Sequence, residues 1–295
     1  MPGSKEEKTK TMKKLILLFF VIFSNLSSSF GQELQVKISG NGPAVILIPG
    51  LSSSGEVWDE TVADLSRNFQ CHVVTLPGFA TNPAGRLQAG FIDTMESLLS
   101  EYIQNQPGKV FLIGHSLGGF LSLHLAKNLP EKIQKAVIVD SYPFYSAAFN
   151  PAATEENMKG MADQMKELML AQSPEQYRAQ QTSTMPMMTT NQLKLPLAVE
   201  WSMESDRMTS AQAMYELMTT DFRQELSEVK TPILVLGAWY SGKNYGLTEE
   251  LVRENFKSQY KLAQNVQIEM APTAHHFIMW DNPEWFMEKI SAFLQ

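Results

Sequence analysis

The sequence predicts an α/β protein with a mostly parallel sheet, flanking helices and a helical insertion between two of the strands. Short apolar runs alternate with segments of helical spacing along residues 34–294. Several runs are apolar without interruption, as in strands that are buried on both faces of a parallel sheet. Between residues 141 and 230 this alternation stops and no strand pattern is visible.

Seven short runs are the predicted strands. The first, LQVKI at 34–38, alternates in polarity, which is typical of an edge strand. The others lie at residues 44–50, 71–78, 109–114, 135–140, 231–238 and 265–270. Helical spacing is found at residues 88–104, from Ser116 to Asn128, and at 283–294. Strands and helices that alternate in this way predict βαβ units.

The segment KVFLIGHSLGG at 109–119 contains a G-x-S-x-G motif between a predicted strand and a predicted helix. In this context the turn exposes the hydroxyl of Ser116 above the strand ends, and the helix N-terminus favours negative charge beside it. Gly114 and Gly118 leave room for close backbone approach. We predict that Ser116 is a nucleophile. A strand–helix turn without a chemical role is the alternative.

A serine nucleophile needs a base, and the pair His275-His276 follows the last predicted strand, at the same sheet edge as Ser116. Together with LIPG, TLPGFA, GHSLGG and the final H-F-I-M-x-D-x-P-E-W-F, this pair makes the chain resemble the α/β-hydrolase family over nearly all of residues 34–294. The resemblance implies the α/β-hydrolase fold. It also implies that the base is the histidine seven positions before Pro283, which is His276, with His275 as the alternative.

The resemblance further implies an oxyanion hole made of two backbone amides. One is the amide of Leu117, directly after the nucleophile, and the other matches Leu51. Family members commonly have His-Gly before this position, whereas this chain has Pro49-Gly50. The serines at 52–54 follow. We expect them to form a solvated turn or to cap the next helix, with a substrate contact as the alternative.

The acid of the triad departs from the family pattern. The family usually has an aspartate about three residues after the glycine that ends the strand at 231–238, but Tyr240 stands there. Some members carry the acid after the preceding strand, where this chain has Asp140. We predict that Asp140 is the acid. A turn or helix-capping role for Asp140 is the alternative, Glu249 is a second candidate acid, and Asp281 belongs to the turn into the last helix.

The segment 141–230 is rich in methionine, with 11 of the 17 in the chain. Met158, Met161, Met165 and Met169 recur at helical spacing, so they line one helix face. Thioethers fill irregular shapes, so Met158, Met161 and Met165 are candidate substrate-binding residues, with ordinary core packing as the alternative. The predicted domains are therefore a core of residues 32–140 and 231–295 and a helical Met-rich cap of residues 141–230.

Residues 1–31 have the pattern of a signal peptide. Lys13-Lys14 precede nine apolar residues, LILLFFVIF, and a small polar stretch follows. Nine residues are too few to cross a bilayer. We expect cleavage after Gly31 and a periplasmic or secreted protein with no stable membrane span after cleavage. An uncleaved anchor is the alternative, and both Met1 and Met12 are candidate starts.

Other classes of function find little support in the sequence. The net charge is −7 and no lysine–arginine cluster is visible, so nucleic acid is not an expected partner. No metal-ligand spacing and no dinucleotide fingerprint is present in the sequence, so neither a metal nor a cofactor is expected. The single cysteine, Cys71, is expected to be buried and inert.

These observations predict an exported serine hydrolase that cleaves small carboxylic esters with an apolar acyl or alcohol part. The same site could instead transfer acyl groups, or hydrolyse amides, lactones or thioesters. A ligand receptor without catalysis is the alternative from another class, because the usual acid position is lost.

Overall fold

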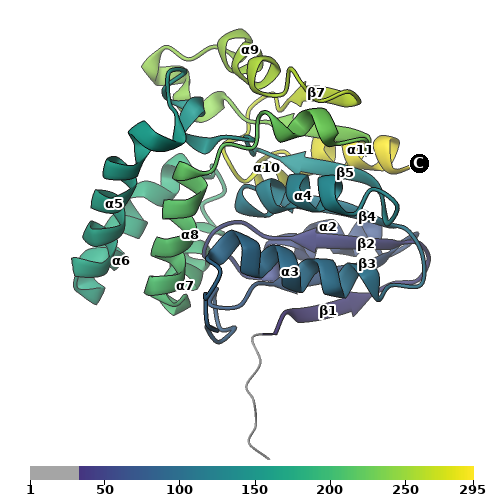
Figure 1. Cartoon of the computed structure of the whole chain (residues 1–295), viewed down its shortest axis with the longest axis horizontal. Coiled ribbons are helices and arrows are strands. Elements are labelled where there is room, and N and C mark those ends of the chain that lie inside the picture. The colour runs from purple at the N-terminus through teal and green to yellow at the C-terminus, as the bar shows by residue number, and fades with distance from the viewer. Residues whose placement is uncertain (1–32) are drawn as a thin grey trace, which may run out of the picture. The chain divides into compact units, whose positions relative to one another are not determined.

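The computed structural model describes residues 33–295, so the predicted signal peptide and its cleavage position lie outside the described residues. Within the described part, seven strands form one sheet in the order β1-β3-β2-β4-β5-β6-β7 (Figure 1). Only β1 is antiparallel to its neighbour. The strands are β1 Gln35–Ser39, β2 Ala44–Ile48, β3 Gln70–Thr75, β4 Val110–His115, β5 Ile133–Val139, β6 Ile233–Gly237 and β7 Val266–Met270. The predicted fold class is confirmed.

Helices cover both faces of the sheet. One face packs against α3, Phe91–Gln104, α4, Leu117–Asn128, and α9, Glu249–Gln259. The other face packs against α2, Asp59–Leu65, α10, Ile278–Asp281, and α11, Pro283–Leu294. Helices on both faces explain why the inner strands are apolar throughout, since neither face of those strands meets water.

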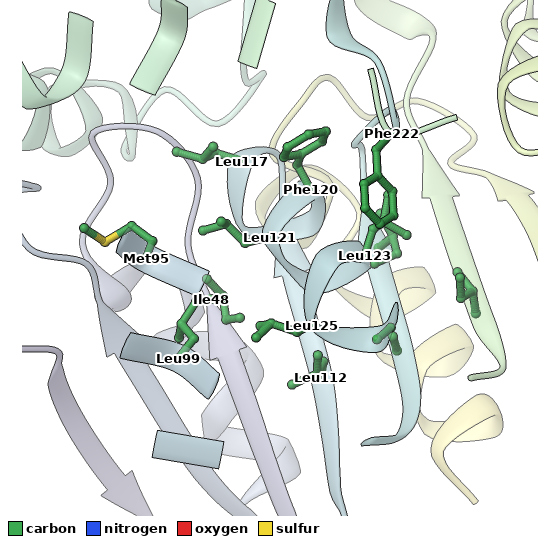
Figure 2. Packing of buried hydrophobic residues seen from close by; sticks show 14 of the residues in the cluster. Ile48, Met95, Leu99, Leu112, Leu117, Phe120, Leu121, Leu123, Leu125 and Phe222 are labelled. Atoms are coloured by element: carbon green, nitrogen blue, oxygen red, sulfur yellow. The ribbon is translucent and has the colours of Figure 1, made fainter. Parts of the chain in front are cut away.

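Strand β2 shows how the two cores are divided. Its side chains alternate, so Ile46 and Ile48 enter the core under α3 and α4 while Val45 and Leu47 enter the opposite core. Figure 2 shows the first core, where Leu117, Leu121 and Leu125 of α4 lie close to β2, β4 and α3. Helix α4 is buried almost entirely along its length, so its first residue is held rigidly at the end of β4.

A helical segment separates β5 from β6. It contains α5, Glu155–Ala171, α6, Pro174–Thr184, α7, Leu195–Glu204, and α8, Arg207–Thr219, which lie together at the left of Figure 1. Helix α5 packs along α8, α6 packs against α7, and α8 also contacts α3. Short 3-10 turns complete the chain: η1 Gly55–Trp58, η2 Tyr145–Ala148, η3 Met185–Met187, η4 Glu225–Glu228 and η5 Tyr240–Tyr245. Among the described residues, no helix is long and apolar enough to cross a membrane.

Alanine substitutions at two helical glycines are expected to have opposite effects on the free energy of unfolding. A Cβ at Gly118 in α4 would lie 2.3 Å from the carbonyl oxygen of Ile48, whereas a Cβ at Gly160 in α5 would meet nothing within 4 Å. Gly118→Ala should therefore force α4 away from β2 and lower the free energy of unfolding by about 1–3 kcal/mol. Gly160→Ala, the matched control, should raise it by up to about 1 kcal/mol. Urea unfolding measures both, and equal values for the two variants would contradict this packing.

Candidate active site

Ser116 occupies the sharp turn between β4 and α4. Its backbone angles are φ 52° and ψ −118°, a conformation that costs a non-glycine residue about 1–3 kcal/mol. The turn is so tight that a Cβ at Gly114 would lie only 2.2 Å from the carbonyl oxygen of Gly118. The Ser116 N–H donates to Val139 C=O at 2.9 Å, and its C=O accepts from Phe120 N–H at 3.0 Å. These hydrogen bonds to strand β5 and within helix α4 therefore keep Ser116 in its strained conformation.

His276 and Asp140 form a close pair, with 2.6 Å between His276 Nδ1 and Asp140 Oδ2. An ionised carboxylate only accepts hydrogen bonds, so the Nδ1–H of His276 donates and Nε2 is left free to accept a proton. Asp140 Oδ1 also accepts the N–H of Ala238 at 2.8 Å. The carboxylate is therefore held from two sides, and its orientation toward the imidazole is fixed.

Asp140 reaches His276 because it directly follows β5. Its backbone adopts a positive φ of 45°, and its N–H donates to Leu236 C=O of β6 at 2.7 Å. The carboxyl end of β5 lies between those of β4 and β6, so Asp140 and Ser116 share one sheet edge. No hydrogen bond joins Ser116 Oγ to His276 in the described residues 33–295. Catalytic hydrogen bonds are often long before substrate binds.

The loop after β2 approaches Ser116 closely. A Cβ at Gly50 would lie 3.0 Å from His115 Nδ1 and 3.2 Å from Ser116 Cβ, so a larger residue there would require these neighbouring side chains to shift. Leu51 follows Gly50, and Leu117 is the first residue of α4. Neither amide N–H donates a hydrogen bond within the described part of the chain. Both amides are therefore free to receive an oxyanion, and the α4 dipole favours negative charge at Leu117.

Comparisons with known proteins show the family of the chain. A sequence profile of the alpha/beta hydrolase family matches residues 45–289. The chain belongs to the alpha/beta hydrolase family. The pimeloyl-[acyl-carrier protein] methyl ester esterase of Vibrio atlanticus (strain LGP32) is 25% identical over 272 residues, covering 88% of this chain and 95% of that protein. The enzyme of the same name from Pectobacterium carotovorum subsp. carotovorum (strain PC1) is 27% identical over 263 residues, covering 88% and 97%.

Solved structures show the same alpha/beta hydrolase fold. The enol-lactonase from Burkholderia xenovorans LB400 has a TM-score of 0.70 at 17% identity and covers 88% of this chain and 96% of its own. A thermophilic esterase from Thermogutta terrifontis has a TM-score of 0.70 at 17% identity, covering 88% and 92%.

The other candidates for the acid and the base lie elsewhere. Glu249 opens α9 and forms an ion pair with Arg253. The ring of Tyr240 lies 6.2 Å from that of His275, not against His276. His275 donates its backbone N–H to Asp281 at 2.8 Å, while no hydrogen bond joins its side chain to Asp140 in residues 33–295. The structure therefore brings Asp140 and His276 together and leaves the alternatives apart from that pair.

His115, the residue before Ser116, contacts His276, a contact that the sequence pattern did not predict. Its Nε2 lies 3.0 Å from the backbone oxygen of His276, so Nε2–H donates to that carbonyl. The two rings lie 4.5 Å apart. Burial holds the pKa of His115 well below its usual value. It therefore stays neutral, and no second cation opposes the charge that His276 would gain.

The helical insertion also supports the His276 loop. Phe277 N–H donates to Met188 C=O at 3.0 Å. Asp281 accepts from Thr189 Oγ1 at 2.6 Å as well as from the His275 backbone. Asp281 therefore ties the histidine loop to the segment between α6 and α7. Nothing in the sequence pattern pairs residues this far apart.

The methionines of α5 do not share one environment. Met158 is 8% exposed and packs with Phe144 and Met218 in a small cluster between α5, η2 and α8. This burial agrees with the core-packing alternative, and the substrate-binding role of Met158 stays a prediction. Met161 and Met165 are 58% and 40% exposed, because α8 covers only part of the apolar face. Their role as pocket lining stays a prediction.

If Asp140 acts through His276, replacing one of its carboxylate oxygens by an amide nitrogen should lower kcat strongly. Asp140→Asn keeps the side-chain shape, but its amide can donate to Nδ1 and so favours the wrong imidazole tautomer. We expect kcat for p-nitrophenyl butyrate to fall by about 10³–10⁴. Glu249→Gln and Tyr240→Phe, the matched controls, should each lower kcat by about tenfold or less. A small loss in Asp140→Asn, or an equal loss in a control, would contradict this assignment of the acid.

Proposed function

We propose that this chain is an exported serine hydrolase that cleaves small carboxylic esters with an apolar acyl or alcohol part. In this proposal Ser116 is the nucleophile, His276 the base and Asp140 the acid. The amides of Leu51 and Leu117 bind the oxyanion. The observation that carries the proposal is the 2.6 Å contact between His276 Nδ1 and Asp140 Oδ2 at the same sheet edge as the strained Ser116 turn.

That the chain is an ester-cleaving enzyme follows from its family and its relatives. It belongs to the alpha/beta hydrolase family, and the curated relatives described above are named as methyl ester esterases. The alternative of a ligand receptor without catalysis was based on the absence of an acid at the usual family position. The carboxylate beside His276 removes that reason.

The geometry suggests an order of steps. Ser116 Oγ attacks the ester carbonyl while His276 Nε2 accepts the hydroxyl proton, and Asp140 stabilises the imidazolium that forms. The negative oxygen of the tetrahedral intermediate is placed at the Leu51 and Leu117 amides. His276 then protonates the leaving alcohol. Water repeats the sequence on the acyl-enzyme and releases the acid.

Two parts of the proposal depend on other features. Export is supported by the sequence of residues 1–31, with cleavage after Gly31. An apolar substrate is supported by the methionine-rich helices beside the strand ends and by the exposed Met161 and Met165.

The nucleophile can be tested by covalent labelling. Ser116→Ala should abolish ester turnover and fluorophosphonate labelling while the unfolding transition persists, because the labelled oxygen is gone. The control is Ser100→Ala, near the end of α3 that leads into the start of β4, at the opposite sheet edge. This variant should label normally. Labelling of Ser116→Ala at another serine would refute the assignment.

The apolar pocket can be tested with a series of p-nitrophenyl esters from acetate to octanoate. We expect kcat/KM to rise toward medium chains, by a total of about 1–3 kcal/mol in transition-state binding, the value of a methylene or two in an apolar pocket. Met161→Ser and Met165→Ser should flatten the rise. An equal kcat/KM across the series in the unmodified protein would contradict an apolar lining and favour an open site.

A further inference from the structure

We propose that Ser52 and Ser210 are positioning residues for the oxyanion hole, so that cap helix α8 holds the Leu51 amide in place for catalysis. This inference rests on the proposed function, because it takes the Leu51 amide as a receiver of the developing negative charge. It assigns a catalytic consequence to a contact between the helical insertion and the sheet.

The Leu51 amide lies in a strained turn. Ser53 N–H donates to Gly50 C=O at 3.3 Å, which closes a four-residue turn directly after β2. The third residue, Ser52, has a φ of 53°. Turns with a positive φ at this position normally have glycine or asparagine there, because other side chains are strained. Whatever keeps this turn in place also sets the direction of the Leu51 N–H.

The group that holds Ser52 comes from α8. The hydroxyl oxygens of Ser52 and Ser210 lie 2.8 Å apart, and the two residues are 7% and 1% exposed. A buried hydroxyl that loses its partner carries the full cost of its desolvation. The two hydroxyls pair with Ser52 in the left-handed conformation, so a turn that relaxes away from Ser210 would leave both of them unpaired. The bond offsets the strain of the turn.

Helix α8 is itself fixed to the core, so Ser210 is a firm point of attachment. At its N-terminal end, Asp206 N–H donates to Gly78 C=O at 2.8 Å. Ser205 Oγ accepts from Ala80 N–H at 2.8 Å. Toward its other end, Glu216 accepts the N–H groups of Phe91 and Ile92 at the start of α3, at 2.7 and 2.8 Å.

Loss of the Ser52–Ser210 hydrogen bond is expected to weaken stabilisation of the transition state rather than binding of the substrate. Oxyanion donors are effective because they are already directed at the position where charge develops. If the Ser52–Ser210 bond is lost, the turn relaxes and the Leu51 N–H no longer points at that position. The ground-state carbonyl carries little charge, so substrate binding should change little. His276 and Asp140 are untouched, so the pH profile should stay as it is.

The test is Ser210→Ala, with Ser202→Ala as the control. Ser202 is also a buried cap serine, but its hydroxyl bonds only to Ala198 C=O of its own helix. Active sites are counted by fluorophosphonate titration, so that unfolded protein is excluded. We expect kcat per site to fall about tenfold in Ser210→Ala, less than the 10²–10³ for removal of a whole donor. KM and the pH profile should stay unchanged. Affinity for an alkyl trifluoromethyl ketone, which forms a tetrahedral adduct with serine, should fall by the same factor.

A rescue variant separates positioning from general packing. Glycine adopts a positive φ without strain, and Ser52→Gly removes the orphaned hydroxyl as well. The double variant Ser52→Gly/Ser210→Ala should therefore recover part of the kcat that Ser210→Ala loses. Ser52→Ala/Ser210→Ala, which keeps the strain, should not recover it.

Several results would overturn the inference. An unchanged kcat in Ser210→Ala, or a change in KM alone, would contradict it. So would a loss of kcat in Ser202→Ala equal to that in Ser210→Ala, or a kcat of Ser52→Gly/Ser210→Ala no higher than that of Ser210→Ala. Failure of the proposed function is a different result, since Ser116→Ala would then keep its turnover.

Discussion

The hydrogen bond from His276 to Asp140 is the contact on which the site depends. It joins two residues that are 136 positions apart in the sequence, and it forms only because β5, β6 and β7 are parallel neighbours whose carboxyl ends meet at one edge. The two oxygens of Asp140 have separate tasks, since one accepts from the imidazole and the other from the Ala238 amide. In the proposed triad, Asp140 therefore takes the place of the acid that the family usually has after β6.

Backbone strain is concentrated at this same edge. Among the described residues, four non-glycine residues have a positive φ, namely Ser52, Ala80, Ser116 and Asp140. They follow β2, β3, β4 and β5, one after each strand. Ser116 and Asp140 are held by hydrogen bonds to neighbouring strands. Ser52 is held by Ser210 within α8, and Ala80 by Ser205 just before α8. Strain of this kind persists only where the surroundings fix it, and here the helical segment between β5 and β6 supplies part of that support.

Much of the fold could be predicted from sequence because its signals are local. Continuous apolar runs predicted the inner strands, and the alternating run at 34–38 predicted an edge strand, which is β1; its antiparallel pairing was not predicted. The motif around Ser116 specified its turn, and the end of β5 specified where Asp140 would lie. Of the serines at 52–54, Ser54 caps η1 as expected, whereas Ser52 and Ser53 are buried rather than solvated.

The contacts of the helical segment between β5 and β6 could not be predicted in the same way. The Ser52–Ser210 and Asp281–Thr189 pairs join small polar residues across 158 and 92 positions, and no periodicity or motif relates their positions. Within α5, Met158 is buried while Met161 and Met165 are exposed, and the methionine spacing could not predict this difference because it depends on how α5 and α8 pack.

The tautomer of His276 tests the central claim most directly. In protein with ¹⁵N-labelled histidine, two-bond nitrogen–proton correlations at neutral pH distinguish a protonated Nδ1 from a protonated Nε2, with His276→Gln used to assign the signal. The account predicts that His276 carries its proton on Nδ1, in a strongly downfield resonance that disappears in Asp140→Ala. A neutral His276 with the proton on Nε2, or an Nδ1–H resonance unchanged by Asp140→Ala, would contradict it.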